Sequence, residues 1–445
     1  MANTFRTLFG RDGSNAFTSF AISHFKNSIE TDPAIPLIIV SLGILLTASS
    51  GSWDISNHLL NRPETFFSPP HAGLYSGVVL VLFGSLATYR YHRHSSKMFD
   101  INNGKPFPTY LRLLLIGVVM LISAGPLDFA WHTAFSLDGL LSPPHAVLAI
   151  GMALCSIGAF LGLISKNNHY DRMKTKTNIE TMTSEVNYFT VELKNRSPND
   201  TTTRNKRSSL YVIISITAIW ITVSGIIHMV SLPFSDTDFF KFNPNPILGG
   251  LVATLCFPFL VSFILFTSWK ITKKFGVLSA SGLIFIFINL VTTILPNENL
   301  VPTIPFYLLN IIPIIMIDVL LSLPALRTSS SISSISSISS ISSISSISSI
   351  SLSQTRKKTV DVLAGIVLGL TFFMLYFPLI THTYNEVSIN PQPVWPSVTA
   401  SIYFGMIDEM YPILVVSSMA VGILGVVVSS KLTALALHDI HGMTK

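Results

Sequence analysis

The sequence has little charge. Only 11% of its 445 residues are Asp, Glu, Lys or Arg, whereas soluble proteins average about 25%. Hydrophobic residues make up 49% of the chain, and the mean hydropathy is +0.57. This composition excludes an ordinary water-soluble domain and makes the lipid bilayer the expected solvent. The net charge of +6 does not indicate nucleic-acid binding, because the basic residues follow a membrane pattern instead.

Cysteine is also scarce. The two cysteines, Cys155 and Cys256, both lie inside apolar runs. Their number and spacing exclude a disulfide framework and a thiolate metal site.

Long apolar runs are abundant. Ten of them have the length of about 20 residues that a hydrocarbon core requires. They are residues 34–52, 72–90, 109–127, 145–165, 209–229, 246–268, 275–295, 303–325, 359–381 and 411–431. The sequence therefore predicts an all-α, polytopic membrane helix bundle with about ten transmembrane helices, built from repeated helix–outer-loop–helix hairpins.

The basic residues predict the orientation of these spans. Of 28 Lys and Arg residues, only Arg62 and Lys241 lie in loops on the side opposite the N-terminus. Because cytoplasmic loops carry the excess of Lys and Arg, both termini are expected in the cytoplasm of a cell-membrane protein. The loops that follow the first and third spans are then extracytoplasmic.

The same patterns divide the chain into segments. The predicted membrane parts are a four-helix unit (34–165), a second four-helix unit (209–326) and a C-terminal hairpin (359–431). The predicted cytoplasmic parts are an N-terminal arm (1–33), a polar linker (166–208), a Ser/Ile low-complexity loop (327–358) and a tail (432–445). Serine-rich tracts pack poorly, so no function is assigned to the Ser/Ile loop.

One stretch of the chain occurs twice. Residues 53–77 and 127–151 align without gaps. The alignment pairs two Asp-x3-His-x12-His motifs, each with a Ser-Pro-Pro before its last histidine. The motif residues are Asp54, His58 and His71 in the first copy and Asp128, His132 and His145 in the second.

The spacing brings these side chains together. Asp and His four residues apart lie on one face of a helix, about 5–6 Å apart at Cβ. Ser-Pro-Pro is typical of a helix start, with Ser as the N-cap and Pro at the first helical position. The last histidine of each copy then lies in the first turn of the returning helix. Two imidazoles and one carboxylate suit copper, zinc or iron and offer too few oxygens for calcium or magnesium.

Several alternatives stay open at this point. The two copies either hold one metal each or share a dinuclear site. Glu64 and Asp138, which align with each other, are candidates to orient an imidazole from outside the ligand set. The competing interpretation is that the motifs only cap helices, with histidines hydrogen-bonded to the caps. Ionisable groups near a membrane are costly and tend to be functional, which favours a metal.

Two weaker copies follow later in the chain. His228 and His382 each end an expected span and precede an Asn-Pro-x-Pro helix start. The aspartate of the motif is replaced by Ser224 and Pro378, and the second histidine is missing. We predict decayed hairpin repeats in which these histidines are structural. The alternative is that they add a ligand from across the bundle.

The second copy resembles a metal motif of the copper membrane monooxygenases, the family of particulate methane and ammonia monooxygenases. The shared pattern is Asp128-x2-Trp131-His132, an acid at Asp138, and Ser-Pro-x-His ending at His145. In that family the motif belongs to one of three membrane subunits. The resemblance implies that the aspartate and both histidines bind copper on the extracytoplasmic side, with Trp131 and Asp138 supporting them. It also implies an oxidoreductase that works with other membrane subunits.

The chain also differs from that family. It carries two motifs and more spans than the usual motif-bearing subunit, and Asn57 replaces the tryptophan in the first copy. Three functions are therefore considered: a copper-dependent membrane oxidoreductase or part of a monooxygenase, a copper-binding accessory, storage or delivery protein, and a metal transporter. Transport predicts ionisable residues deep in the spans, where Asp318 is the clearest acid. Nothing in the sequence indicates a substrate.

Overall fold

The fold is all-helical in the part of the chain that the structure, a computed structural model, describes. That part comprises residues 32–59, 68–98, 107–135, 142–183, 198–231, 246–294, 301, 304–309, 311–322, 359–370 and 411–442, and it contains no strand. Seven of its helices are long and apolar enough to cross a membrane. The predicted all-α, polytopic membrane fold is therefore confirmed.

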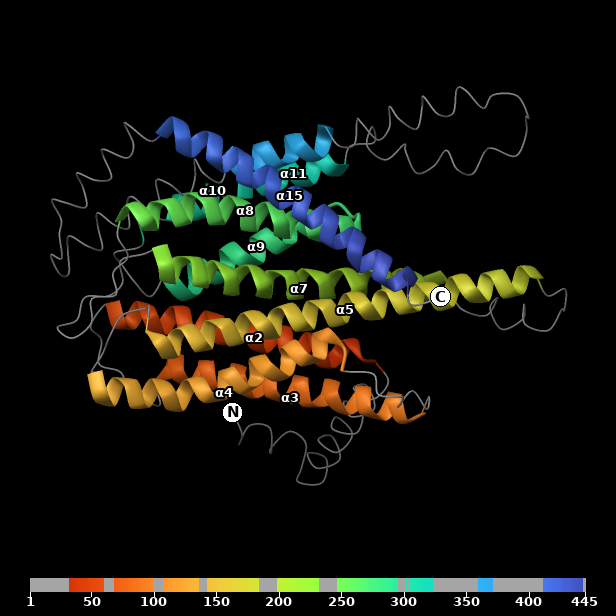
Figure 1. The fold of residues 1–445 in the computed structure, drawn as a ribbon, viewed down its shortest axis with the longest axis horizontal. Coiled ribbons are helices and arrows are strands. Elements are labelled where there is room, and N and C mark those ends of the chain that lie inside the picture. The colour runs from red at the N-terminus through yellow and green to blue at the C-terminus, as the bar shows by residue number, and fades with distance from the viewer. Residues whose placement is uncertain are drawn as a thin grey trace, which may run out of the picture.

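The helices pack side by side in one bundle (Figure 1). Their bounds are α2 (Ala34–Leu59), α3 (Pro69–Met98), α4 (Thr109–Phe135), α5 (Pro143–Thr183), α7 (Pro198–Ser231), α8 (Pro246–Thr272), α9 (Val277–Asn289), α10 (Ile304–Leu309), α11 (Ile311–Ser322) and α15 (Tyr411–Gly442). A further apolar helix spans Thr359–Leu370. Helices α2 and α3 pack against each other, as do α4 and α5, and α7 packs against both α2 and α5.

Three of the ten expected spans are shorter helices in the structure. Helix α9 continues as a π-helical segment, Leu290–Ile294. The span expected at 303–325 is broken into α10 and α11. Asn310, between these two helices, lies outside the described residues, and Pro313 in the first turn of α11 lacks the N–H that would bond to the carbonyl of Leu309. The span expected at 359–381 is described only as far as Leu370.

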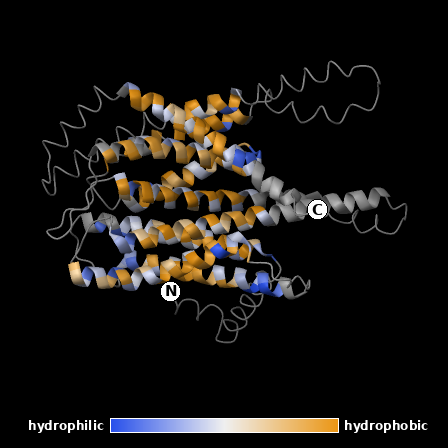
Figure 2. Cartoon of the chain, viewed as in Figure 1, coloured by the Kyte–Doolittle hydropathy of each residue, from blue (hydrophilic) through white to orange (hydrophobic). Residues whose placement is uncertain are grey.

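Apolar side chains point outward as well as inward. Ile116 and Val119 on α4 are 54% and 67% exposed. Figure 2 shows hydrophobic residues along the lengths of the helices. In water such exposure would be costly, whereas lipid solvates these side chains readily. The outer surface of the bundle is therefore suited to contact with a lipid bilayer.

The repeat seen in the sequence extends along whole helices. In the first hairpin, α2–α3, a Cβ on Gly43 would lie 2.8 Å from the carbonyl oxygen of Gly77. In the second, α4–α5, a Cβ on Gly117 would lie 2.8 Å from the carbonyl oxygen of Gly151. The glycines of the second pair each lie 74 residues after those of the first pair, which is also the offset between the two metal motifs. Small residues let the two backbones of each hairpin approach closely, as in other membrane helix pairs.

A second contact repeats with the same offset. A Cβ on Gly84 would lie 2.7 Å from the carbonyl oxygen of Pro36, and one on Gly158 would lie 2.9 Å from that of Tyr110. Glycine is required at both positions because any larger residue would meet backbone atoms. The two hairpins are therefore structural copies, and their motif ends are held in equivalent positions.

The later helices pack around aromatic side chains. Trp220 of α7 stacks on Phe285 of α9, with ring centroids 4.4 Å apart. Both residues are buried in a cluster that also includes Phe257 and Phe266 of α8. Helices α2 and α5 contact α7, so this core joins the motif-bearing hairpins to the rest of the bundle.

Asp318, the acid inside an expected span, caps a helix. It is fully buried on α11. Its Oδ2 accepts hydrogen bonds from the backbone N–H of Gly276 at 2.9 Å and from the hydroxyl of Ser279 at 2.7 Å. These partners lie at the start of α9, where unsatisfied N–H groups and the helix dipole favour a carboxylate. The contacts give Asp318 a structural role and count against an ion-relay function.

Replacing Asp318 with alanine should destabilise the bundle. The change leaves buried donors at the start of α9 without their acceptor, which costs about 1–3 kcal/mol per group. We expect a lower melting temperature of the detergent-purified protein. The matched control is Asp361→Ala, which removes a looser ion pair with Lys270, 3.8 Å long. An equal loss of stability in both variants would contradict the capping role.

Candidate metal centre

The second motif lies where α4 ends and α5 begins. Asp128 and His132 occupy the last two turns of α4, and His145 is the third residue of α5. The backbone N–H of His145 donates to Oγ of Ser142 at 3.5 Å, and the N–H of Ala146 donates to the Ser142 carbonyl at 3.0 Å. The predicted serine N-cap and the position of His145 in the first helical turn are therefore confirmed.

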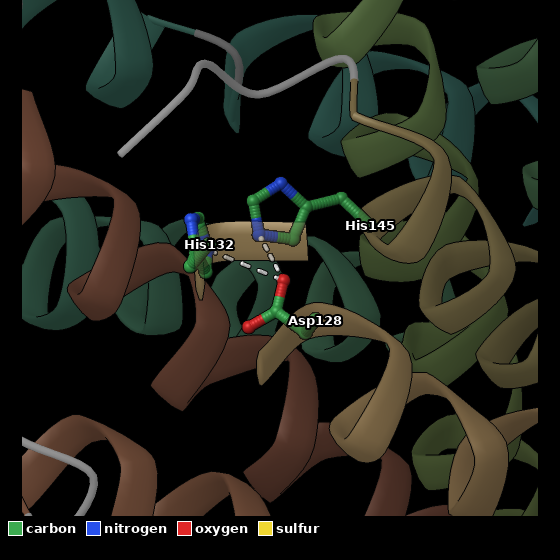
Figure 3. Close-up of side chains that lie close together, drawn as sticks. All are labelled: Asp128, His132 and His145. Carbon is green, nitrogen blue, oxygen red and sulfur yellow. Dashed lines mark ion pairs between the residues drawn. The ribbon is translucent and has the colours of Figure 1, made fainter. Parts of the chain in front are cut away.

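The three side chains converge on one point (Figure 3). Nε2 of His132 and Nε2 of His145 each lie 3.4 Å from Oδ1 of Asp128. The possible ligand atoms all lie within 4.8 Å of one another. Among the described residues, this is the one group of three or more His, Cys, Asp or Glu side chains that could hold a metal ion.

The spacing of these atoms fits a metal ion. Ligands bound tetrahedrally at about 2.0–2.1 Å are separated from each other by about 3.3 Å. The two nitrogen–oxygen distances of 3.4 Å match that separation. Side-chain exposures of 33% for Asp128, 21% for His132 and 16% for His145 place the group partly open to its surroundings. Three protein ligands with an open side leave a coordination position for another molecule.

In the described part of the chain, the second ring nitrogen of His145, Nδ1, is free to bind a supporting residue outside the ligand set. Nδ1 of His145 is buried and has no hydrogen-bond partner among the described residues. A metal-bound histidine normally donates this N–H to a carboxylate, a carbonyl or water. Asp138, predicted for such a role, lies outside the described residues, so its part stays a prediction.

The first motif has a related but different arrangement. Nε2 of His71 lies 2.9 Å from Oδ1 of Asp54, and the two side chains are only 19% and 10% exposed. The His71 ring also stacks on Tyr75, with centroids 6.1 Å apart. The backbone of His58 is in the last turn of α2, and its side chain is outside the described part. The structure thus brings together two of the three residues predicted for this copy.

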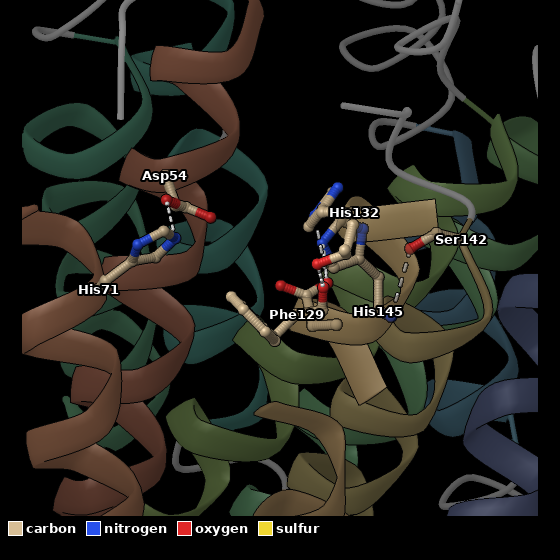
Figure 4. Close-up of polar contacts among 8 residues, drawn as sticks. Asp54, His71, Phe129, His132, Ser142 and His145 are labelled. Carbon is tan, nitrogen blue, oxygen red and sulfur yellow. Dashed lines mark hydrogen bonds and ion pairs between the residues drawn. The ribbon is translucent and has the colours of Figure 1, made fainter. Parts of the chain in front are cut away.

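The two motifs lie at the same end of the bundle. Figure 4 shows the Asp54–His71 pair beside the second group. The carboxylates of Asp54 and Asp128 are close enough to interact electrostatically, and Tyr75 interacts with both. A cation bound at either motif would therefore lower the negative potential at the other.

The remaining predicted residues lie away from this geometry or outside the described part. Trp131 packs against Phe135, with ring centroids 4.5 Å apart. The ring of His228, at the end of α7, packs against Phe257 at 4.9 Å, which supports the predicted structural role. Glu64 and His382 lie outside the described residues.

Tyr75 was not predicted from the sequence. It is one helical turn beyond His71 on α3, and the second copy has Ala149 at the equivalent position. The signal that could have indicated it is this difference between two otherwise matching copies. A large polar aromatic residue at one position of a repeat suggests a contact that only one copy makes.

Comparison with known proteins gives no match to a family model, to a curated protein or to a solved structure. The function must therefore be inferred from the motif and from the geometry of the site.

Proposed function

We propose that this chain is an integral membrane copper-binding protein, related to the motif-bearing membrane subunit of the copper membrane monooxygenases. Copper would be held by Asp128, His132 and His145. The observation that carries the proposal is the convergence of both Nε2 atoms on Oδ1 of Asp128, at 3.4 Å each. That arrangement coincides with the motif whose resemblance to the family was noted from the sequence alone.

Copper is preferred over zinc or iron for two reasons. Divalent copper binds a given nitrogen and oxygen site more tightly than the other first-row metals, and the resembling family uses copper at this motif. When bound, copper supplies one-electron and oxygen chemistry. The residues of this chain hold the ion at the helix ends and leave a coordination position open, which an oxidoreductase, or one part of a larger oxidoreductase, requires.

The distribution of charge supports a location on the outer face. The helix ends opposite both motifs carry basic residues. At the ends of α3 and α8 and at the start of α4 these include Arg90, Arg93, Arg112, Lys270, Lys273 and Lys274. By the positive-inside rule, these ends face the cytoplasm and the motifs are extracytoplasmic. Copper would then enter from outside, and other membrane subunits would complete an enzyme.

The test is copper retention together with oxygen chemistry. We expect the detergent-purified chain, loaded with Cu2+ in the presence of equimolar Zn2+, to keep copper after desalting. Adding a reductant should then reduce the copper, and oxygen should reoxidise it, as followed by electron paramagnetic resonance (EPR). Retention of zinc in place of copper would reject the copper assignment. Copper that is bound but never reoxidised would favour an accessory, storage or delivery protein over an oxidoreductase.

A further inference from the structure

One face of α2 leads from the membrane interior to the first motif. Along this face, Gly43 and Thr47 pack against Gly77 of α3, Ser50 packs against Gly73, and Asp54 pairs with His71. These positions are spaced alternately by four and three residues, which is the pattern of one helix face. Asn57, three residues beyond Asp54, continues it. The amide of Asn57 is therefore on the face that carries the Asp54 carboxylate.

The buried amide oxygen of Asn57 lacks a hydrogen-bond partner among the described residues. Only 9% of the surface of this residue is exposed. Oγ of Ser68, directly before the start of α3, is also buried without a described partner. A buried oxygen left without a partner costs about 1–3 kcal/mol. A bound cation would satisfy the Asn57 oxygen, which lies on the same helix face as the Asp54 carboxylate.

The second hairpin does not share this feature. Asn57 is replaced there by Trp131, whose ring packs against Phe135. The serine equivalent to Ser68 is Ser142, and its Oγ accepts the N–H of His145. The oxygens of Asn57 and Ser68 therefore have no unpartnered counterparts at the equivalent positions of the second copy, although the helices that carry the two motifs are structural copies.

We propose that Asp54, Asn57 and His71 form a second cation site, richer in oxygen than the site in the second hairpin, that binds a harder divalent ion of the Mn2+ type. A carboxylate and an amide oxygen suit Mn2+, whereas the imidazole disfavours Mg2+ and Ca2+, which prefer all-oxygen sites. The proposal does not depend on which metal the second hairpin binds.

The test uses the full chain in detergent with Mn2+ as the probe, titrated and followed by EPR. All variants are made in a His132→Ala/His145→Ala background, so that the second hairpin cannot contribute. We expect Asn57→Leu to weaken Mn2+ binding about tenfold or more. Asn57→Asp, which keeps the oxygen and adds charge, should tighten binding about tenfold. The matched control is Asn289→Leu, an amide on α9 whose Nδ2 donates to the carbonyl of Phe285.

The possible results distinguish the role of Asn57 from the existence of the second cation site. Weaker binding in Asn57→Leu, tighter binding in Asn57→Asp and no change in Asn289→Leu would support the site. Equal binding in all variants would overturn the role of Asn57. No Mn2+ binding in the background protein would overturn the second cation site, and it would leave the copper proposal standing.

Discussion

Replacing His132 and His145 together with alanine is expected to weaken copper binding at the second motif by more than about 100-fold. Loss of a residue that only supports a metal ligand already lowers metal affinity by about 10–100-fold, and here two of the three ligands themselves are lost. The remaining carboxylate of Asp128 would be a poor site for Cu2+ on its own. Metal content is measured by mass spectrometry after desalting of the loaded protein, with zinc and iron quantified beside copper.

The matched control removes two histidines from the opposite end of a helix. His92 and His94 lie in the last two turns of α3, far along the helix from His71. His92→Ala/His94→Ala should retain as much copper as the wild type. If both double variants retained equal copper, the metal would not be at the second motif, and its residues would be helix caps.

A leucine at Gly117 is expected to have the largest effect on folding. The Cβ alone would lie 2.8 Å from the carbonyl oxygen of Gly151 and 2.6 Å from Sγ of Cys155. Backbone atoms cannot move aside as a flexible side chain can, so α4 and α5 must separate. Overpacking in a well-packed core costs about 1–3 kcal/mol, and a backbone clash should reach or exceed the upper end of that range. The separation would also pull His145 away from Asp128.

Gly125 provides the control for this substitution. It lies two turns further along α4, and a Cβ there would meet nothing within 4 Å. We expect Gly125→Leu to keep the melting temperature of the wild type, whereas Gly117→Leu should lose both thermal stability and copper. Equal stability of the two variants would contradict the close α4–α5 packing on which the ligand geometry depends.

Much of the helical framework could be predicted because the bilayer imposes it. Each apolar run of sufficient length must form a helix to satisfy its backbone, and seven of the ten expected spans coincide with helices long enough to cross a membrane. The other three contain shorter helices within the described residues. Helix breaks were harder to predict. Pro313 lies at the start of α11, whereas Pro126 and Pro258 lie inside the continuous helices α4 and α8, so proline alone does not predict where a helix ends.

The full extent of the repeat could not be predicted from the ligand motifs alone. Gly43 and Gly117 occupy equivalent positions at the same offset as Asp54 and Asp128, but single glycines in apolar runs carry little signal alone. Their significance depends on which backbone they touch, which only the structure gives. The role of Asp318 was hidden for the same reason. A buried acid in a span suggests an ion pathway, and the distant backbone donor on Gly276 cannot be read from spacing.

The convergence of Asp128, His132 and His145 could be predicted in part. Helix periodicity places Asp128 and His132 on one face of α4, and the Ser-Pro-Pro start places His145 in the first turn of α5. The distance between the two helix ends depends on how α4 packs against α5. The difference between the two motifs could not be predicted. It depends on the burial of Asn57 and on the direct pairing of His71 with Asp54, both of which result from packing between α2 and α3.

The most direct test of the central claim is pulsed EPR of the Cu2+-loaded wild-type chain, counting the imidazole nitrogens coupled to the metal. We predict two coupled imidazoles in the wild type and one in His145→Ala, with each copper ion also bound to an oxygen. Copper coupled to no imidazole, or to the same two imidazoles in both proteins, would contradict a metal centre formed by Asp128, His132 and His145.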